Sequence, residues 1–400
     1  MCPTQYGFQA GKSTLDALIK FSSDVYSELD QSSYLLSIFV DFAKAFDTVP
    51  HDVLLRKLEF YGIRGIINEW FGDYLSERSH FTVVDNEKSS SARVSMGVPQ
   101  GSVLGPVLFL LFVNDLPNFS NVLTSILFAD DANIYLTGKD PSKLITTANV
   151  ELFKLYKWCL ANRISMNSIK TLFIMFGNKP PSNLPPLTIK SGSSYEVIKR
   201  ANKAKFLGVF YDENMTFKAH VNYLVQRLSR TSSLIYQLKD FLPTFALKTI
   251  YNAQVASMLN YCNIIWSGAF TSTLLPLIRL TKRIIRNVTH SHFIAHTDPL
   301  FLESKILNLN LLRQYNLALY FVKYKIYNQD NLQRLHHHNT RFKTNLRVPQ
   351  YHTRLYRQSF LCEGIKFFNE LNESSLIDLD KIITLTSLKK RLKKYFLSKL

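Results

Sequence analysis

Cysteine is scarce in this sequence. Its four cysteines, Cys2, Cys159, Cys262 and Cys362, lie far apart, and no two form a Cys-x-x-Cys pair. Their spacing argues against a zinc site and against a disulfide framework, and it fits a reducing compartment. We find neither a signal peptide at the start nor an internal repeat.

Long apolar runs are also missing. The longest run, residues 103–113, is interrupted by Gly105 and Pro106. It is much shorter than the roughly 20 residues that a membrane-spanning helix needs. We therefore expect no transmembrane segment and no membrane partner. The hydrophobic fraction of 46% indicates a globular chain, and 400 residues allow two or three domains.

Acidic residues are few in the second half of the chain. Residues 1–200 hold 19 basic and 19 acidic side chains, whereas residues 201–400 hold 29 basic and 11 acidic ones. The net charge of +18 therefore arises entirely after residue 200. Such an excess favours a polyanionic partner, of which nucleic acid is the commonest. A basic surface that only keeps the protein soluble is the alternative.

Hydrophobic periodicity and turn residues predict an α+β fold. Helices are expected over about 13–29, 51–61, 66–78, 104–112 and 141–162. Strands are expected up to residue 40, on both sides of 129–131, near 171–176, and as pairs within 187–211. Residues 80–95 suggest a hairpin with a polar tip at 87–91. From about 217 the chain reads as helical and basic. Residues 388–396 would form an amphipathic basic helix, with a solvated face or a phosphate contact. The three histidines at 336–338 favour a solvated loop over a metal site.

Three aspartates stand beside apolar runs. Asp130 and Asp131 lie inside the run 126–135, and Asp41 follows the run 35–40. A buried unpaired carboxylate is costly and two neighbours repel one another, so the pattern favours a bound cation. Three carboxylates at strand ends suit a two-metal phosphoryl-transfer site with magnesium or manganese. Taken alone, the Asp-Asp pair fits an ordinary turn better.

Two glycine-rich segments invite a phosphate-binding interpretation. Only three residues separate Gly7 from Gly11-Lys-Ser, where a P-loop has four, and no apolar strand precedes them. We reject the P-loop, although Lys12 could meet phosphates as a point charge. In residues 97–105, glycine permits close approach to a ligand, and Gln100 offers both donors and acceptors. A tight turn before the apolar helix is the alternative.

Phe46 follows Asp41 by five residues. An aromatic ring there could pack against the sugar of a nucleotide and exclude a 2′ hydroxyl. Ordinary core packing is the alternative, and it is favoured on sequence alone.

Together these motifs resemble a reverse transcriptase, most closely that of jockey-like non-LTR retrotransposons. The motifs, in order, are Gln5-Tyr-Gly-Phe, Phe39-Val-Asp-Phe-Ala-Lys-Ala-Phe-Asp, Gly97-Val-Pro-Gln-Gly-Ser, Phe128-Ala-Asp-Asp, Asn167-Ser-Ile-Lys and Lys205-Phe-Leu-Gly-Val. The resemblance covers roughly residues 5–220. A mobile-intron maturase would share this core, but the Phe-Ala-Asp-Asp form and residues 206–220 favour the retrotransposon.

The resemblance implies a right-hand polymerase. Residues 1–212 would form partial fingers and a palm, an antiparallel sheet with packed helices. Residues 213–300 would form a thumb, and 301–400 a basic helical C-terminal region. The implied activity is RNA-directed DNA polymerase, with two Mg²⁺ ions (Mn²⁺ possible), dNTPs, an RNA template and a DNA primer or target DNA. An intracellular product, nuclear and cytoplasmic, is expected.

The resemblance also implies roles for single residues. Asp41, Asp130 and Asp131 match metal-binding carboxylates, and Lys170 matches a lysine proposed to protonate the leaving pyrophosphate. The residues matched to nucleotide, template or primer binding are Phe46, Gln100, Gly101, Phe206, Leu207 and Gly208.

Three features depart from the family pattern. Gln9 stands where an arginine usually pairs with the triphosphate, and a neutral amide lacks that charge. Lys12 could partly compensate. The upstream finger strands and an endonuclease domain are absent from the sequence, so endonuclease activity must come from a missing part or another protein. A truncated, catalytically inactive nucleic-acid-binding remnant is therefore the alternative function.

Overall fold

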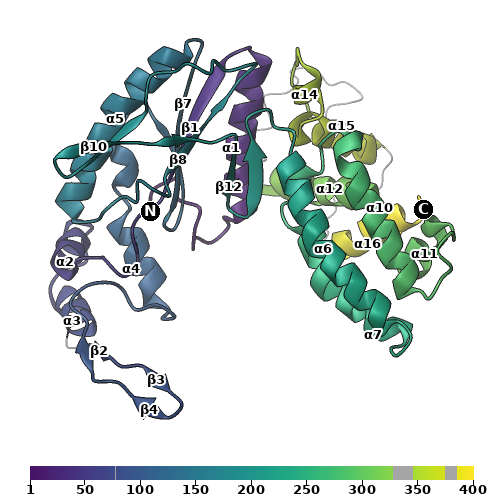
Figure 1. Ribbon diagram of the computed structural model, residues 1–400, viewed down its shortest axis with the longest axis horizontal. Helices are drawn as coiled ribbons and strands as arrows, with labels where there is room; N and C mark the ends of the chain where they lie inside the picture. The colour runs from purple at the N-terminus through teal and green to yellow at the C-terminus, as the bar shows by residue number, and fades with distance from the viewer. Residues whose placement is uncertain (77, 328–345, 374–384) are drawn as a thin grey trace. The chain divides into compact units, whose positions relative to one another are not determined.

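The computed structural model describes residues 1–76, 78–327, 346–373 and 385–400 (Figure 1). The chain divides into two compact units, one of Met1–Phe21 with Ser32–Gly208 and one of Ser22–Gln31 with Val209–Leu400. Helix α1 (Thr14–Asp30) is shared between them. Among the described residues, no helix combines the length and apolarity needed to cross a membrane. The predicted loop at 336–338 lies outside the described residues.

A five-stranded sheet forms the centre of the first unit. Its order is β11 (Lys199–Arg200), β8 (Leu172–Phe176), β1 (Tyr34–Val40), β7 (Asp131–Gly138) and β6 (Thr124–Phe128). Neighbouring strands are antiparallel except β11, which runs parallel to β8. This sheet and its helices confirm the predicted α+β class, with one parallel pair added to the expected antiparallel sheet.

Each face of the sheet is covered by different helices. Because side chains alternate along a strand, Leu36, Ile38 and Val40 share one face of β1. They join the apolar core that contains the inner stripe of α5 (Pro141–Asn162) and residues of α2 (His51–Phe60) and α4 (Leu104–Phe112). On the other face, Phe39 packs edge-on against Phe21 of α1 at 6.1 Å between ring centroids. Figure 1 shows α5 and α1 on opposite sides of the sheet.

A hairpin follows α3 (Ile66–Leu75). Its paired strands are β2 (Ser79–His80) with β5 (Ala92–Arg93), and β3 (Val83–Val84) with β4 (Glu87–Lys88). The hairpin was predicted, but the predicted tip at 87–91 was wrong. The tip is Asp85-Asn86, and both residues have positive φ, 49° and 67°. That conformation matches the mirror-image turns of two-residue hairpins, which Asn and Asp tolerate.

The remaining elements of the first unit are short. They are η1 (Leu116–Phe119), β9 (Thr188–Ser191), β10 (Ser194–Val197) and β12 (Lys203–Phe206). β9 and β10 pair antiparallel, within the region predicted as paired strands.

The second unit is mainly helical, as predicted from about residue 217 onward. After β13 (Val209–Asp212) come α6 (Lys218–Leu238), α7 (Thr244–Ile250), the π-helix η2 (Tyr251–Ala256), α8 (Ser257–Asn260), α9 (Asn263–Trp266), α10 (Thr271–Val288), α11 (Thr297–Glu303), α12 (Leu309–Tyr327), α14 (Arg354–Arg357), α15 (Phe360–Glu373) and α16 (Leu385–Leu397). α16 contains the predicted basic helix.

Buried polar contacts join distant parts of the second unit. The Arg313 guanidinium of α12 donates to Glu363 Oε2 of α15 at 2.6 Å and to the Ile264 carbonyl at 3.3 Å. The Asp30 carboxylate accepts the Thr353 N–H at 2.7 Å, just before α14 begins. Since charge-assisted hydrogen bonds are stronger than neutral ones, these contacts tie α12 to α9 and α15, and the end of α1 to the start of α14.

Candidate active site

The β6–β7 hairpin carries two of the three predicted carboxylates. Phe128 pairs with Asp131, so Ala129 and Asp130 form the two-residue turn between the strands. Ala129 has a φ of +54°, in the left-handed region that alanine rarely adopts. The predicted strands on both sides of residues 129–131 are present and are joined by this turn. The turn leaves Asp130 and Asp131 at the exposed end of the sheet, so the burial suggested by the apolar run was wrong.

The third carboxylate, Asp41, directly follows β1. Its backbone is held on both sides by the turn that precedes β8. The Asp41 N–H donates to Thr171 Oγ1 at 3.2 Å, and the Asp41 carbonyl accepts the Asn167 N–H at 2.7 Å. The same turn carries Lys170, whose Nζ lies 4.0 Å from Asp41 Oδ2. Both side chains are largely open to solvent, so this ion pair contributes little stability.

Strand register brings the three carboxylates to one end of the sheet. Val40 of β1 pairs with Ala132 of β7, so Asp41 and Asp131 are the next residues along the two strands. Partial desolvation raises the pKa of the Asp131 carboxyl, and the charges of Asp130 and Asp41 raise it further. Lys205 opposes that shift. The three groups therefore interact electrostatically, with repulsion that a cation would relieve.

The donor set suits a hard divalent cation. Carboxylate oxygens are the ligands that Mg²⁺ and Mn²⁺ prefer. The pKa of the Asp131 carboxyl is raised mainly by desolvation and further by the charges of Asp130 and Asp41, and a bound cation would offset both effects. In the described part of the chain, no three His, Cys, Asp or Glu side chains are already arranged to hold a metal. The three aspartates thus fit the ion in their chemistry and in their place at one end of the sheet.

The predicted nucleotide-binding residues Phe46 and Gln100 come from different segments, the turn after β1 and the loop before α4. The half-buried Phe46 ring stacks on Phe109 of α4, with centroids 4.2 Å apart and planes 20° apart. The core-packing alternative therefore describes one face of Phe46. Gln100 is exposed and donates from Nε2 to Asp47 Oδ1 at 2.7 Å. Gly101, beside it, has a φ of +79° and open space around its Cα.

Two predicted contacts are engaged within the protein. Lys12 Nζ donates to the carbonyls of Pro3 and Gln5, at 2.6 and 2.7 Å, so it holds the chain start rather than standing free. Phe206 is buried and packs edge-on against Phe39 at 5.7 Å. Leu207 and Gly208 follow it with positive φ, 43° and 82°, and form the turn after β12.

A basic pocket beside Gln100 was not predicted. It has a volume of about 570 Å³, and Arg78, His80 and Arg93 line it together with Asp47 and residues 94–100. Guanidinium groups bind phosphate in a bidentate manner. The signal in the sequence was two arginines, Arg78 and Arg93, at the base of the predicted hairpin.

The reverse transcriptase (RNA-dependent DNA polymerase) family model matches residues 1–211. The chain belongs to this family. The matched region contains every predicted site residue and the whole five-stranded sheet.

Two relatives of the chain come from mobile elements of Drosophila melanogaster. The chain is 28% identical over 301 residues to the probable RNA-directed DNA polymerase from transposon BS of Drosophila melanogaster, covering 71% of this chain and 32% of that protein. It is 26% identical over 317 residues to the RNA-directed DNA polymerase from mobile element jockey of the same species, covering 76% and 33%. The chain thus spans about a third of the length of these relatives.

One solved structure similar to the chain is that of apo telomerase from Candida tropicalis. The identity is 10% and the TM-score 0.39, covering 98% of this chain and 57% of that one.

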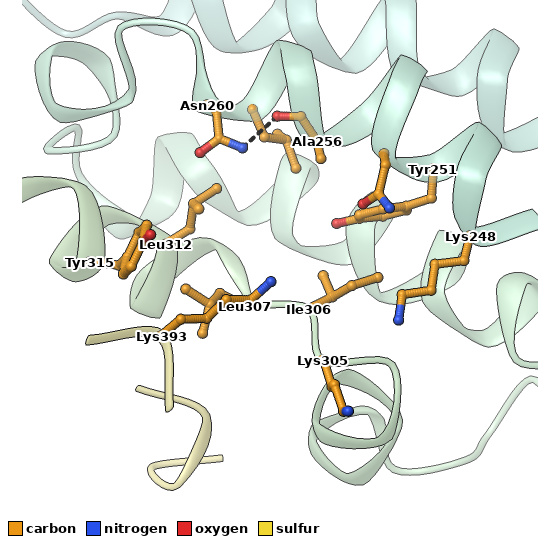
Figure 2. A pocket seen from close by; sticks show the side chains of 12 residues that line it. Lys248, Tyr251, Ala256, Asn260, Lys305, Ile306, Leu307, Leu312, Tyr315 and Lys393 are labelled. Atoms are coloured by element: carbon orange, nitrogen blue, oxygen red, sulfur yellow. Dashed lines mark hydrogen bonds between the residues drawn. The ribbon is translucent and has the colours of Figure 1, made fainter. Parts of the chain in front are cut away.

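A second concave surface lies within the second unit, away from the carboxylates in sequence. It has a volume of about 370 Å³, and three lysines, Lys248, Lys305 and Lys393, line it (Figure 2). None of the described residues that line it is an Asp or Glu. Tyr251 and Asn252, at the start of the π-helix η2, also face this pocket. Short π-helical segments often occur at functional sites.

Proposed function

We propose that this chain is an RNA-directed DNA polymerase of a non-LTR retrotransposon, which transfers a nucleotide from a dNTP to a primer 3′ hydroxyl. One observation carries the proposal: strand pairing brings Asp41, Asp130 and Asp131 to the same end of the sheet in a chain of the reverse transcriptase family. Three carboxylates of this kind are what a two-metal phosphoryl-transfer site requires.

In this mechanism the three aspartates hold two Mg²⁺ ions, which Mn²⁺ could replace. When bound, the ions neutralise charge on the reacting phosphate and activate the primer hydroxyl. Lys170 lies on the turn that is anchored to Asp41, and in this proposal it would protonate the departing pyrophosphate. The exposed edge of Phe46 would meet the nucleotide sugar.

We further propose how the chain divides its work. Residues 1–212 act as partial fingers and palm, 213–300 as a thumb, and 301–400 as a basic helical region. Gln100 and Gly101 would lie along the incoming nucleotide and template, and Phe206, Leu207 and Gly208 would shape the turn next to the primer. The RNA template and DNA primer explain the positive charge of residues 201–400.

Primer extension on an RNA template tests the activity. Asp41→Asn and Asp130→Asn are each expected to reduce dNTP incorporation roughly 100-fold or more, because each removes charge that holds the ions. Asp52→Asn is the control, since this exposed aspartate pairs with Arg56 and Arg163 instead. Unchanged incorporation in both site variants would overturn the assignment.

An inactive nucleic-acid-binding remnant is the rival function, favoured by Gln9 at the position of the triphosphate-binding arginine. It predicts RNA binding that weakens steeply with salt, with no dNTP incorporation. Processive synthesis by the purified 400-residue chain would rule it out.

A further inference from the structure

The chain start lies alongside the strand that leads to the carboxylate turn. Residues 4–7 run parallel to β6: the Leu127 N–H donates to the Thr4 carbonyl at 3.0 Å, and the Tyr6 N–H donates to the Leu127 carbonyl at 2.8 Å. Through this isolated parallel bridge, the segment extends the sheet beyond its edge strand β6, next to the β6–β7 turn.

The Gln5 side chain reaches from this segment into the turn itself. Gln5 is 2% exposed. Its Oε1 accepts two backbone hydrogen bonds, from the Gly7 N–H at 2.8 Å and from the Ala129 N–H at 3.0 Å. Ala129 is the turn residue with the unfavourable positive φ, and it directly precedes Asp130. A strained conformation persists only where its surroundings hold it.

Two neighbours keep Gln5 in place. Gly7 approaches the turn so closely that a Cβ on it would lie 2.5 Å from the Ala129 nitrogen. Lys12 clamps the segment by donating to the Pro3 and Gln5 carbonyls. The segment is thus a fixed support from which one side-chain oxygen contacts the turn.

We propose that Gln5 is a positioning residue for the metal site: it fixes the Ala129 backbone so that the Asp130 carboxylate is directed toward the ion. The inference rests on the proposed function. Gln5 Nε2 is buried and has no hydrogen-bond partner among the residues that the structure describes, so only the oxygen of this amide is used there. Packing alone would be served equally well by an apolar side chain, which would not leave a buried donor unsatisfied.

Mn²⁺ binding to the purified full chain, followed by electron paramagnetic resonance, tests the proposal without relying on activity. Gln5→Met keeps the volume and removes the acceptor. We expect Gln5→Met to weaken Mn²⁺ binding about 5-fold or more, because that fold-change corresponds to the net contribution of one ordinary hydrogen bond. Gln5→Asn, which draws the oxygen back by one methylene, gives the same comparison if Gln5→Met does not fold.

The matched control is Ser37→Ala. Ser37 Oγ accepts a buried hydrogen bond from Asn133 Nδ2 at 2.7 Å, in the same sheet but within paired strands. The Ser37→Ala substitution removes this acceptor, so it should lower the thermal stability of the protein without changing its affinity for Mn²⁺.

The outcomes distinguish a failure of the proposed role of Gln5 from a failure of the proposed polymerase function. Mn²⁺ binding that is weakened in the Gln5 variants and preserved in Ser37→Ala supports the proposal. Equal Mn²⁺ affinity in the wild type and the Gln5 variants overturns it and leaves the proposed function standing. No Mn²⁺ binding by the wild type overturns both.

Discussion

His220 is a titratable side chain enclosed in the second unit. It is 2% exposed, its Nδ1 accepts the Phe210 N–H at 3.4 Å, and its ring centroid lies 5.4 Å from that of Trp266. Burial lowers the pKa of His220 to about 4. The neutral imidazole is therefore the form that fits this site.

This burial predicts a pH-dependent stability. An unfolded histidine titrates near 6.5, so between pH 6.5 and 4 the unfolded chain binds a proton that the folded chain does not. The free energy of unfolding should be highest above pH 6.5 and fall by up to about 3 kcal/mol as the pH drops toward 4. Denaturant unfolding at a series of pH values measures it.

His220→Phe should flatten this profile, because it removes the titrating group while keeping an aromatic ring. The exposed His292 supplies the control, and His292→Phe should leave the profile as steep as in the wild type. A profile equally steep in both variants would contradict the assignment to His220.

At the scale of single residues, the sequence predicted which carboxylates meet but not how they are held. Asp41 was recognisable because it ends an apolar run, and Asp130 and Asp131 because they interrupt one. The sequence also favoured a turn at the pair, but the exposure of the two carboxylates depends on where the sheet ends. Gln5 could be assigned to a motif from the sequence, but its contact with the turn could not be predicted, because its partner Ala129 is distant in sequence.

The contact between the chain start and the β6–β7 turn makes a prediction for Gly7. In Gly7→Ala the new Cβ would lie 2.5 Å from the Ala129 nitrogen, so the segment and the turn must move apart. We expect a loss of about 1–3 kcal/mol in the free energy of unfolding, as for overpacked cores. Thermal or denaturant unfolding measures it.

Gly72→Ala is the matched control. Gly72 lies inside α3, and its added Cβ would meet only Leu55 Cδ1, at 3.9 Å. This substitution should stabilise the protein by up to about 1 kcal/mol, because alanine favours helix. If the Gly7→Ala protein were as stable as the Gly72→Ala protein, the predicted steric conflict between residue 7 and the Ala129 nitrogen would be contradicted.

Among elements, long periodic helices were predictable and local backbone conformation was not. α1 and α5 agree with their predicted spans to within a residue or so, since their apolar stripes repeat over many turns. The hairpin tip was misplaced because Asp85 and Asn86 turn the chain through positive φ, whereas the polar run after them forms β4. The parallel pairing of β11 depends on tertiary contacts alone.

For the whole molecule, the uneven charge predicts nucleic-acid binding that involves the second unit. Replacing Lys248, Lys305 and Lys393 with glutamine should weaken RNA binding and lower the slope of log affinity against log salt by up to about 3. Fluorescence anisotropy with labelled RNA at several salt concentrations measures both quantities.

A triple variant of Lys239, Lys366 and Lys399 is the control, because each of these ammonium groups already lies over a tyrosine ring of the same unit. It removes the same charge from other places. Equal losses in the two triple variants would mean that total charge matters and the pocket does not. The charge excess could be counted from the sequence. That Lys248, Lys305 and Lys393 line one pocket could not, because they are far apart along the chain.

The central place of β1 has a consequence for biosynthesis. Its two partners in the sheet are β7 and β8, so β1 leaves the ribosome long before residues 131–138 and 172–176 exist. Until then an apolar strand has both edges unpaired, a condition that promotes aggregation. Slowing the translation of residues 41–176 should therefore lower the yield of folded protein, and chaperones that shield residues 34–40 of the nascent chain should raise it.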